Sequence, residues 1–451
     1  MRLVFPLLLL LSASIVFALI TVPPMHGDFT VAHWGAEGPG FVAVVGIDNE
    51  PHNVTLFTKE SFDWWMKKNP GTAVYNGMLR RGDVLIIETP PGRYVLAVYP
   101  LPFLRGRTQT YAASYSGWAP VGVMSLPREP SAFGAAAGYF EVRMLKARGF
   151  EYGRRPGING TSIQLNAMVV AELADGGRQY YFVQNVLGLL TDDRKYRFTV
   201  NIINHTSKSR DLSRGAVNGR GGVYWSIYTS FYGYETRKEQ YSLPFSGFLI
   251  VNVSAVGGVA KIDFGYNVGG GVVWYDSVAI KPYAPVERAY ILAGHAVTPI
   301  RTIASLELVL CGYGVATESP GTSSILSTSI ASLYAELEDV DVSLALLVWD
   351  GGRWRPAPRI FNFGFNTAEA VSLNVEAQLV NGTVRIAKGA FKPQLLAEEP
   401  PEPDIPPPGA ATKPQVDSWL FTTVAAAVVL LFLVVYKAGS VLIDRLAGRR
   451  R

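Results

Sequence analysis

The sequence predicts an all-β protein in which β-sandwich-like domains lie between two terminal apolar segments. Short segments rich in Val, Ile, Tyr and Phe recur roughly every 8–14 residues between Gly, Asn and Pro breaks. No long stretch between the apolar segments has the 3.6-residue apolar period of an amphipathic helix. At 451 residues the chain is too long for one ordinary domain, so we expect two or three.

The first segment, residues 1–22, is an apolar run that carries a single charge, Arg2. Val16-Phe17-Ala18 fits a small-residue cleavage site, so the segment is interpreted as a signal peptide, with an uncleaved anchor as the alternative.

Residues 25–105 are predicted to form an N-terminal β-sandwich domain. Strands are expected at 41–45, 54–57, 84–87 and 94–99, and a short helix at 61–68. The triplet Arg81-Gly82-Asp83 is interpreted as a hairpin turn rather than an adhesion motif.

Residues 108–392 are predicted to form a second, larger β domain. Two of its strands, 162–167 and 181–186, carry Gln and Asn among bulky apolar residues, and Asp175-Gly176-Gly177 suits a hairpin turn between them. Polar and apolar residues alternate strictly in the first strand and loosely in the second. Amides on strands are informative because a buried amide must satisfy four hydrogen-bonding positions.

The C-terminal part predicts attachment to a membrane. Residues 397–417 are rich in proline and acidic residues and are expected to form an extended stalk without a packing role. Residues 418–437 include 18 consecutive residues without a charge, long enough for a transmembrane helix. The basic tail, 438–451, predicts a cytoplasmic C-terminus and an ectodomain outside the cell membrane.

The charge balance argues against nucleic acid as a partner. The formal net charge is +5, and Arg2 together with residues 437–451, which carry five basic groups and one acid, accounts for all of it. The ectodomain is therefore neutral overall and lacks the basic footprint of a nucleic-acid-binding protein. Charged residues make up only 17% of the chain, which indicates either an acidic environment or dilution by the apolar segments.

Several kinds of catalytic centre are excluded by motif. The five histidines are scattered, Cys311 is the only cysteine, and no serine elbow, P-loop or Asp-Thr/Ser-Gly signature occurs. We therefore expect no metal and no cofactor, and Cys311 is interpreted as a buried small residue. Five Asn-X-Ser/Thr triplets are possible glycan sites: Asn53, Asn159, Asn204, Asn252 and Asn381.

An ordered set of motifs resembles the thermopsin family of archaeal, acid-active, cell-surface endopeptidases. The set comprises Gly138–Val142, the pair SIQLNAMVV and YYFVQNVL, Asn201–Ser207, Val273–Ile280, Leu306–Gly314 and Asn362–Ala370. The resemblance covers residues 115–375 and implies a polypeptide substrate. Ser125, Val200 and Asn366 stand where the resemblance leads us to expect acids.

The resemblance implies carboxyl chemistry, with candidate catalytic residues Asp276, Glu307 and Glu369. One ionised carboxyl of a pair would activate water while its protonated partner would act as the acid. Each of the three is equally compatible with a structural role, as a solvated or turn-bonded acid. The amides Gln164, Asn166, Gln184 and Asn185 are candidates for binding the substrate backbone or for satisfying buried strands.

Two functions remain open on the sequence. The first is a membrane-anchored, extracytoplasmic acid endopeptidase that uses a carboxyl pair. The alternative is a non-catalytic surface binding or envelope module on the same scaffold, which the three missing acids favour.

Overall fold

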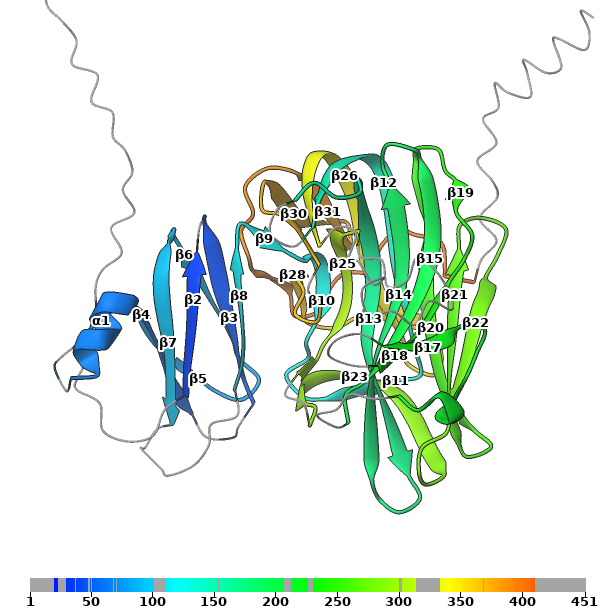
Figure 1. The fold of residues 1–451 in the computed structure, drawn as a ribbon, viewed down its shortest axis with the longest axis horizontal. Coiled ribbons are helices and arrows are strands. Elements are labelled where there is room, and N and C mark those ends of the chain that lie inside the picture. The colour runs from blue at the N-terminus through cyan, green and yellow to red at the C-terminus, as the bar shows by residue number, and fades with distance from the viewer. Residues whose placement is uncertain are drawn as a thin grey trace, which may run out of the picture.

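The protein is described by a computed structural model and is built almost entirely from β-strands (Figure 1). The structure describes residues 20–22, 30–100, 110–313 and 333–409, apart from short gaps at 37, 48, 50, 68, 70, 152–154, 207–211, 226–229, 300–301 and 368. The predicted all-β class is confirmed for these residues.

The N-terminal unit contains two sheets and one helix. Its five-stranded sheet consists of β1 (Ile20–Val22), β5 (Gly71–Leu79), β4 (His52–Thr58), β7 (Gly92–Pro100) and β2 (Thr30–Ala36), in that order. Its three-stranded sheet consists of β6 (Val84–Thr89), β3 (Gly40–Gly46) and β8 (Thr110–Ser116). Helix α1 (Lys59–Trp65) begins at Thr58, whose side chain accepts a hydrogen bond from the Ser61 N–H, a standard N-cap.

The larger domain is a sandwich of a 13-stranded and an 11-stranded sheet. The 13-stranded sheet contains β10 (Val121–Ser125), β11 (Ser131–Phe133), β13 (Gly160–Leu173), β14 (Arg178–Leu190), β15 (Lys195–Asn204), β17 (Gly222–Trp225), β18 (Ser230–Glu235), β19 (Glu239–Gln240), β23 (Val286–Val297), β24 (Ile303–Ala304), β25 (Leu306–Gly312), β28 (Ile360–Phe363) and β32 (Leu395–Ala397). The 11-stranded sheet contains β9 (Trp118–Ala119), β12 (Ala135–Phe150), β16 (Val217–Asn218), β20 (Phe245–Val256), β21 (Val259–Asn267), β22 (Val273–Ile280), β26 (Tyr334–Trp349), β27 (Trp354–Pro356), β29 (Ala370–Ser372), β30 (Val375–Val380) and β31 (Thr383–Lys388). A 3-10 turn, η1 (Arg214–Ala216), precedes β16.

The main core lies between these two sheets. Ile163 and Leu165 of β13 and Leu308 of β25 pack there with Phe140 of β12 and Leu249 of β20. Because side chains alternate across a strand, the residues next to these apolar ones on β13 and β25 must project from the other face of the 13-stranded sheet.

Part of that other face is covered by the N-terminal unit. Strand β3 turns Val42 and Val44 toward the five-stranded sheet, while Phe41 and Val45 pack with Phe363 of the larger domain. The three-stranded sheet is thus buried on both sides, and the N-terminal unit is joined to the larger domain through it (Figure 1).

The Arg81-Gly82-Asp83 turn lies at this junction. The carbonyl oxygen of Gly82 accepts a hydrogen bond of 2.6 Å from the Arg359 guanidinium, and Arg128 forms an ion pair with Asp83 at 3.0 Å. The triplet is a turn that connects the two units, but the expected hairpin is wrong, because β5 and β6 on either side of it belong to different sheets.

The expected division between residues 105 and 108 does not separate two sheets. Strand β8 follows that point in sequence, yet it pairs along its whole length with β3, from Gly40 opposite Ser116 to Gly46 opposite Thr110. Residues 110–116 therefore belong structurally to the N-terminal unit, because their hydrogen-bonding partner lies there.

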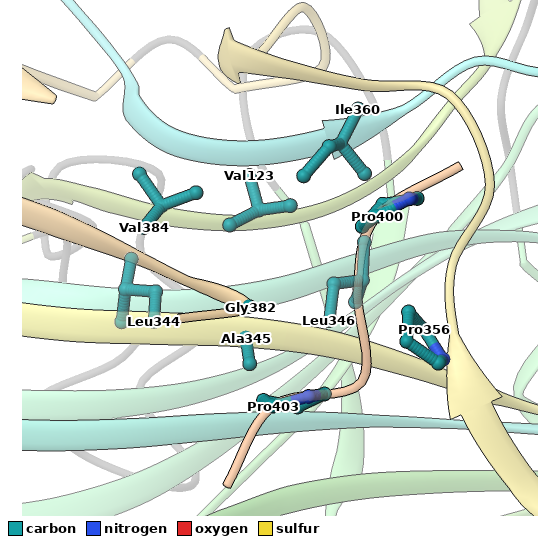
Figure 2. Close-up of a pocket in the computed structure, with 10 residues that line it drawn as sticks. All are labelled: Val123, Leu344, Ala345, Leu346, Pro356, Ile360, Gly382, Val384, Pro400 and Pro403. Atoms are coloured by element: carbon teal, nitrogen blue, oxygen red, sulfur yellow. The ribbon is translucent and has the colours of Figure 1, made fainter. Parts of the chain in front are cut away.

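The proline-rich segment packs against the larger domain as far as residue 409. Pro400 and Pro403 lie over Leu344 and Leu346 of β26 and enclose a cavity of only about 10 Å³ (Figure 2). The Pro408 carbonyl accepts a hydrogen bond from Asn267. The expectation of a stalk without a packing role is wrong for residues 398–408, because short apolar prolines fit the groove beside β26.

The predictions of a signal segment, a transmembrane helix and a cytoplasmic tail concern mostly residues that the structure does not describe. Residues 1–19 and 410–451 lie outside the described part, whereas Ile20–Val22 form β1 and pair with β5. Within the described residues, no helix combines the length and apolar character that crossing a bilayer requires.

Candidate functional site

A row of polar side chains crosses the outer face of the 13-stranded sheet, opposite the main core. Strand register places Glu307 of β25 beside Asn166 of β13, Asn166 beside Gln184 of β14, and Gln184 beside Asn201 of β15. Directly paired residues of adjacent strands lie on the same face, so the four side chains project together. We call this set, with Gln164 two residues before Asn166, the polar row.

The amides of the polar row hydrogen-bond to one another. The Gln184 Nε2 donates to Gln164 Oε1 at 3.1 Å and to Asn166 Oδ1 at 3.2 Å. Asn166 Nδ2 donates to Gln164 Oε1 at 3.4 Å, and Asn201 Nδ2 donates to Gln184 Oε1 at the same distance. Asn201 Oδ1 is buried and finds no hydrogen-bond partner among the residues that the structure describes, so one acceptor of the row is unused by them.

Glu307 stands at one end of the row and has no exposed surface. Its carboxylate is held by the turn that follows β28: Phe365 N donates to Oε1 at 2.8 Å, and Asn366 N lies 3.2 and 3.3 Å from the two oxygens. Ser305, two residues earlier on the same chain, donates its hydroxyl hydrogen to Oε1. A carboxylate that accepts several hydrogen bonds in this way is fixed in one orientation.

Burial raises the pKa of the Glu307 carboxyl, because the charged form loses its hydration in the interior. Hydrogen bonds from Ser305, Phe365, Asn366 and Asn166 favour the charged form and oppose this rise without cancelling it. A buried carboxyl whose neutral form is favoured within a cluster of amides is a candidate general acid.

Glu369 lies at the far end of the same turn region. Its N–H donates to Thr367 Oγ1 at 3.3 Å, and the Thr367 hydroxyl donates to its carboxylate. Glu369 and Glu307 both raise the pKa of the buried Cys311 thiol, after burial itself, so both carboxyls lie near this residue. Among the described residues, no hydrogen bond joins the two carboxyls directly.

Asp276 lies apart from these two acids. It is on β22 of the 11-stranded sheet, and its carboxylate accepts hydrogen bonds from Tyr232 at 2.7 Å, Arg220 N at 3.0 Å and Ser277 N at 2.9 Å. Tyr232 is on β18, and four strand spacings of about 4.8 Å separate β18 from β25. Glu307 and Glu369 thus both act on Cys311, whereas Asp276 lies in a separate, hydrogen-bonded position between the sheets.

Asn185 is also separated from the polar row. Its side chain points into the main core, where Nδ2 donates to the carbonyls of Ile250 and Gly265 at 2.9 Å each and Oδ1 accepts from Tyr275 at 2.7 Å. This amide ties the two sheets together. Adjacent residues of a strand face opposite ways, so Gln184 and Asn185 could not both have belonged to one surface.

The three positions at which acids were expected differ in orientation. Ser125 turns to the inner side, where its hydroxyl donates to the Pro358 carbonyl, and Val200 is part of the main core. Asn366 alone lies at Glu307, with its side-chain amide donating to Ser305 Oγ at 2.6 Å and to the Ile303 carbonyl at 2.9 Å. Only this departure concerns the surroundings of Glu307.

Sequence reasoning missed Ser305, Thr367, Asn201 and the tyrosines of β8. Strand parity could have indicated Ser305, which precedes Glu307 by two residues, and Asn201, which lies in a recognised motif. No local signal connects β8 with Glu307. Its tyrosines approach the carboxyl only through the packing of the N-terminal unit.

Comparison with known proteins gives one family match. A family model described as Thermopsin matches residues 108–375, which is more than half of the chain. No curated protein matches the sequence. The matched range contains the whole polar row, Glu307, Glu369 and Asp276, and it begins just before β8.

Proposed function

Since the chain belongs to the thermopsin family, we propose that it is a membrane-anchored, extracytoplasmic acid endopeptidase with Glu307 and Glu369 as its carboxyl pair. The family implies an acid endopeptidase of thermopsin type and a polypeptide substrate. The assignment of the two carboxyls and the attachment to the membrane are our proposals.

The observation that carries the assignment is the environment of Glu307. Its carboxyl is fully buried, its pKa is raised by that burial, and it adjoins side-chain amides on the neighbouring strand. A carboxyl of this kind keeps its proton in mild acid and can donate it to a leaving amine.

In the proposed reaction the two carboxyls have opposite tasks. The Glu369 carboxylate takes a proton from water, whose oxygen forms a bond to the carbonyl carbon of the scissile peptide. Glu307 gives its proton to the peptide nitrogen, the carbon–nitrogen bond breaks, and an amine leaves. Exchange of protons with solvent then restores the starting protonation state of both carboxyls.

The amides Gln164, Asn166 and Gln184 are proposed to bind the substrate backbone. Side-chain N–H groups can donate to the carbonyl oxygen as negative charge develops on it. Asn201 continues the row, and its unpartnered oxygen offers an acceptor for a backbone N–H of the substrate. Asn185 is not included, because it is satisfied inside the core.

The proposed location follows from the two ends of the sequence. A signal or anchor segment at residues 1–22 and a transmembrane helix at 418–437 would place the ectodomain outside the cell membrane and the basic tail in the cytoplasm. Substrates would then be polypeptides in an acidic external medium.

A second candidate function is a non-catalytic binding or envelope module. Two observations favour it: Asn366 occupies the position from which an acid would face Glu307, and both carboxylate oxygens of Glu307 are bonded by the chain itself. In this second function, Glu307 would serve to anchor the turn after β28.

Substitution of the carboxyls separates the two functions. The wild-type protein should cleave an unfolded protein substrate at roughly pH 2–5, and Glu307→Gln and Glu369→Gln should each reduce kcat by at least about 100-fold. Asp276→Asn serves as the control and should retain kcat when folded. Full activity of Glu307→Gln would remove the site assignment. A folded wild-type protein without activity at any acid pH would support the binding module.

A further inference from the structure

The N-terminal unit reaches the candidate site through strand β8. Tyr115 of β8 lies between the two units: its ring packs against Phe41 of β3 with the ring centres 4.8 Å apart, and its hydroxyl donates to the Gly364 carbonyl at 2.5 Å. The Tyr115 side chain therefore links β3, in the N-terminal unit, to the turn after β28.

Gly364 connects Tyr115 to Glu307. A Cβ on this residue would lie 2.8 Å from Glu307 Oε2, which leaves no room for a side chain at that position. The next two residues, Phe365 and Asn366, donate their N–H groups to the Glu307 carboxylate. The position of the Gly364 peptide thus determines where these two donors point.

We propose that Tyr115 is a positioning residue for Glu307, through which the N-terminal unit becomes part of the site. Its hydroxyl donates to the Gly364 carbonyl and so fixes the turn after β28. That turn presents two N–H groups to the Glu307 carboxylate. The inference rests on the proposed function only in that Glu307 is taken as a catalytic carboxyl. The positioning itself is independent of catalysis.

The chemistry around the carboxyl gives the direction of the effect. The titratable groups that interact electrostatically with it are Tyr111 and Tyr115 from β8 and Cys311 from β25, and Glu369 also acts on Cys311. Loss of the Tyr115 hydroxyl leaves all charges unchanged but frees the turn. Weaker N–H donation then disfavours the charged carboxylate, so the pKa of Glu307 should rise further.

The test uses Tyr115→Phe in the full chain, with Tyr99→Phe as the matched control. Tyr99 is a buried tyrosine of the N-terminal unit, and its hydroxyl interacts with Asn53 and Thr55 instead of the turn. Tyr115→Phe should move the upper limb of the pH–activity profile to higher pH and lower kcat by about tenfold with KM little changed. Tyr99→Phe should do neither.

A second readout does not depend on activity. Carbon NMR of the side-chain carboxyls, with Glu307→Gln used to assign the signal, should show the Glu307 titration displaced upward in Tyr115→Phe and unchanged in Tyr99→Phe. Displacement in a protein without peptidase activity would support the positioning and refute the proposed function. An active protein whose Tyr115→Phe profile and titration match the wild type would overturn the positioning alone.

Should Tyr115→Phe fail to fold, Phe41→Leu provides the second variant. It removes the aromatic contact that supports the Tyr115 ring and leaves the hydroxyl in place. The same upward displacement, smaller in size, is expected. An unchanged titration in this variant would contradict the inference that the N-terminal unit influences Glu307.

Discussion

Asn366 lies directly over Glu307, with its backbone N–H 3.2 and 3.3 Å from the two carboxylate oxygens and its side-chain amide 2.6 Å from the Ser305 hydroxyl that also bonds the carboxylate. An acid at residue 366 would therefore share the hydrogen-bond network of Glu307. In this chain the network contains one carboxyl and one amide.

Asn366→Asp is expected to create a coupled pair of carboxyls. Two like charges in one buried network cannot both ionise easily, so one pKa falls and the other rises. The pH–activity profile should shift, and thermal unfolding at pH 7 should show a loss of stability on the order of 1–3 kcal/mol that is absent at pH 3, where the pair carries at most one charge.

Ser125→Asp is the matched control, because Ser125 is the other polar residue at a position where an acid was expected. Its side chain faces the inner side and bonds to Pro358. The new acid should destabilise the fold without changing the pH profile. A profile altered by Ser125→Asp but not by Asn366→Asp would contradict the orientation described above.

His295 should make the junction between the two units weaker in acid. Burial, together with Arg359, Arg128 and Arg81, lowers the pKa of His295 to about 4, although Asp83 partly opposes this. The unfolded chain binds the proton at a pKa near 6.5, so stability should fall as pH decreases from about 6.5 to about 4 and level off below.

His295→Gln should remove this part of the pH dependence. A glutamine oxygen can still accept from Arg359, whose guanidinium lies 3.2 Å from His295 Nε2, but it cannot be protonated. Between pH 7 and pH 4, the free energy of unfolding of His295→Gln should fall by on the order of 2–3 kcal/mol less than that of the wild type. Parallel curves for the two proteins in denaturant titrations would contradict the prediction.

The proline-rich segment should contribute to stability. A chain that ends at Ala397 loses Pro400 and Pro403 from the groove beside β26, and it also loses Glu398, which forms an ion pair with the buried Arg359 at 3.4 Å. Compared with a chain that ends at Gly409, its free energy of unfolding should fall by on the order of 3 kcal/mol. Equal melting temperatures would show that these contacts are unimportant.

The predicted topology can be checked on intact cells. A protease added from outside should remove the ectodomain and leave a tag after Arg451 protected, because the basic residues that follow the apolar segment favour the cytoplasmic side. Permeabilised cells provide the control, in which the tag should be lost. Loss of the tag on intact cells would reverse the proposed orientation.

The sequence by itself determined the all-β class, the two strands that carry the amides, and the family. These properties depend on local patterns: side-chain alternation, turn residues and an ordered set of motifs within residues 115–375. The same alternation also determines that Ser305, just before β25, lies on the same side as Glu307 and that Gln184 and Asn185 do not share a face, although the pairing partners cannot be read from it.

Only the tertiary structure decided which acids lie apart. Asp276 and Glu307 have equally suggestive sequence contexts, but one lies between the sheets and the other lies on the outer face of the 13-stranded sheet. The contact between Tyr115 and Gly364 joins residues 249 positions apart. Such contacts arise from the register of distant strands and the packing of separate sheets, which no local sequence pattern encodes.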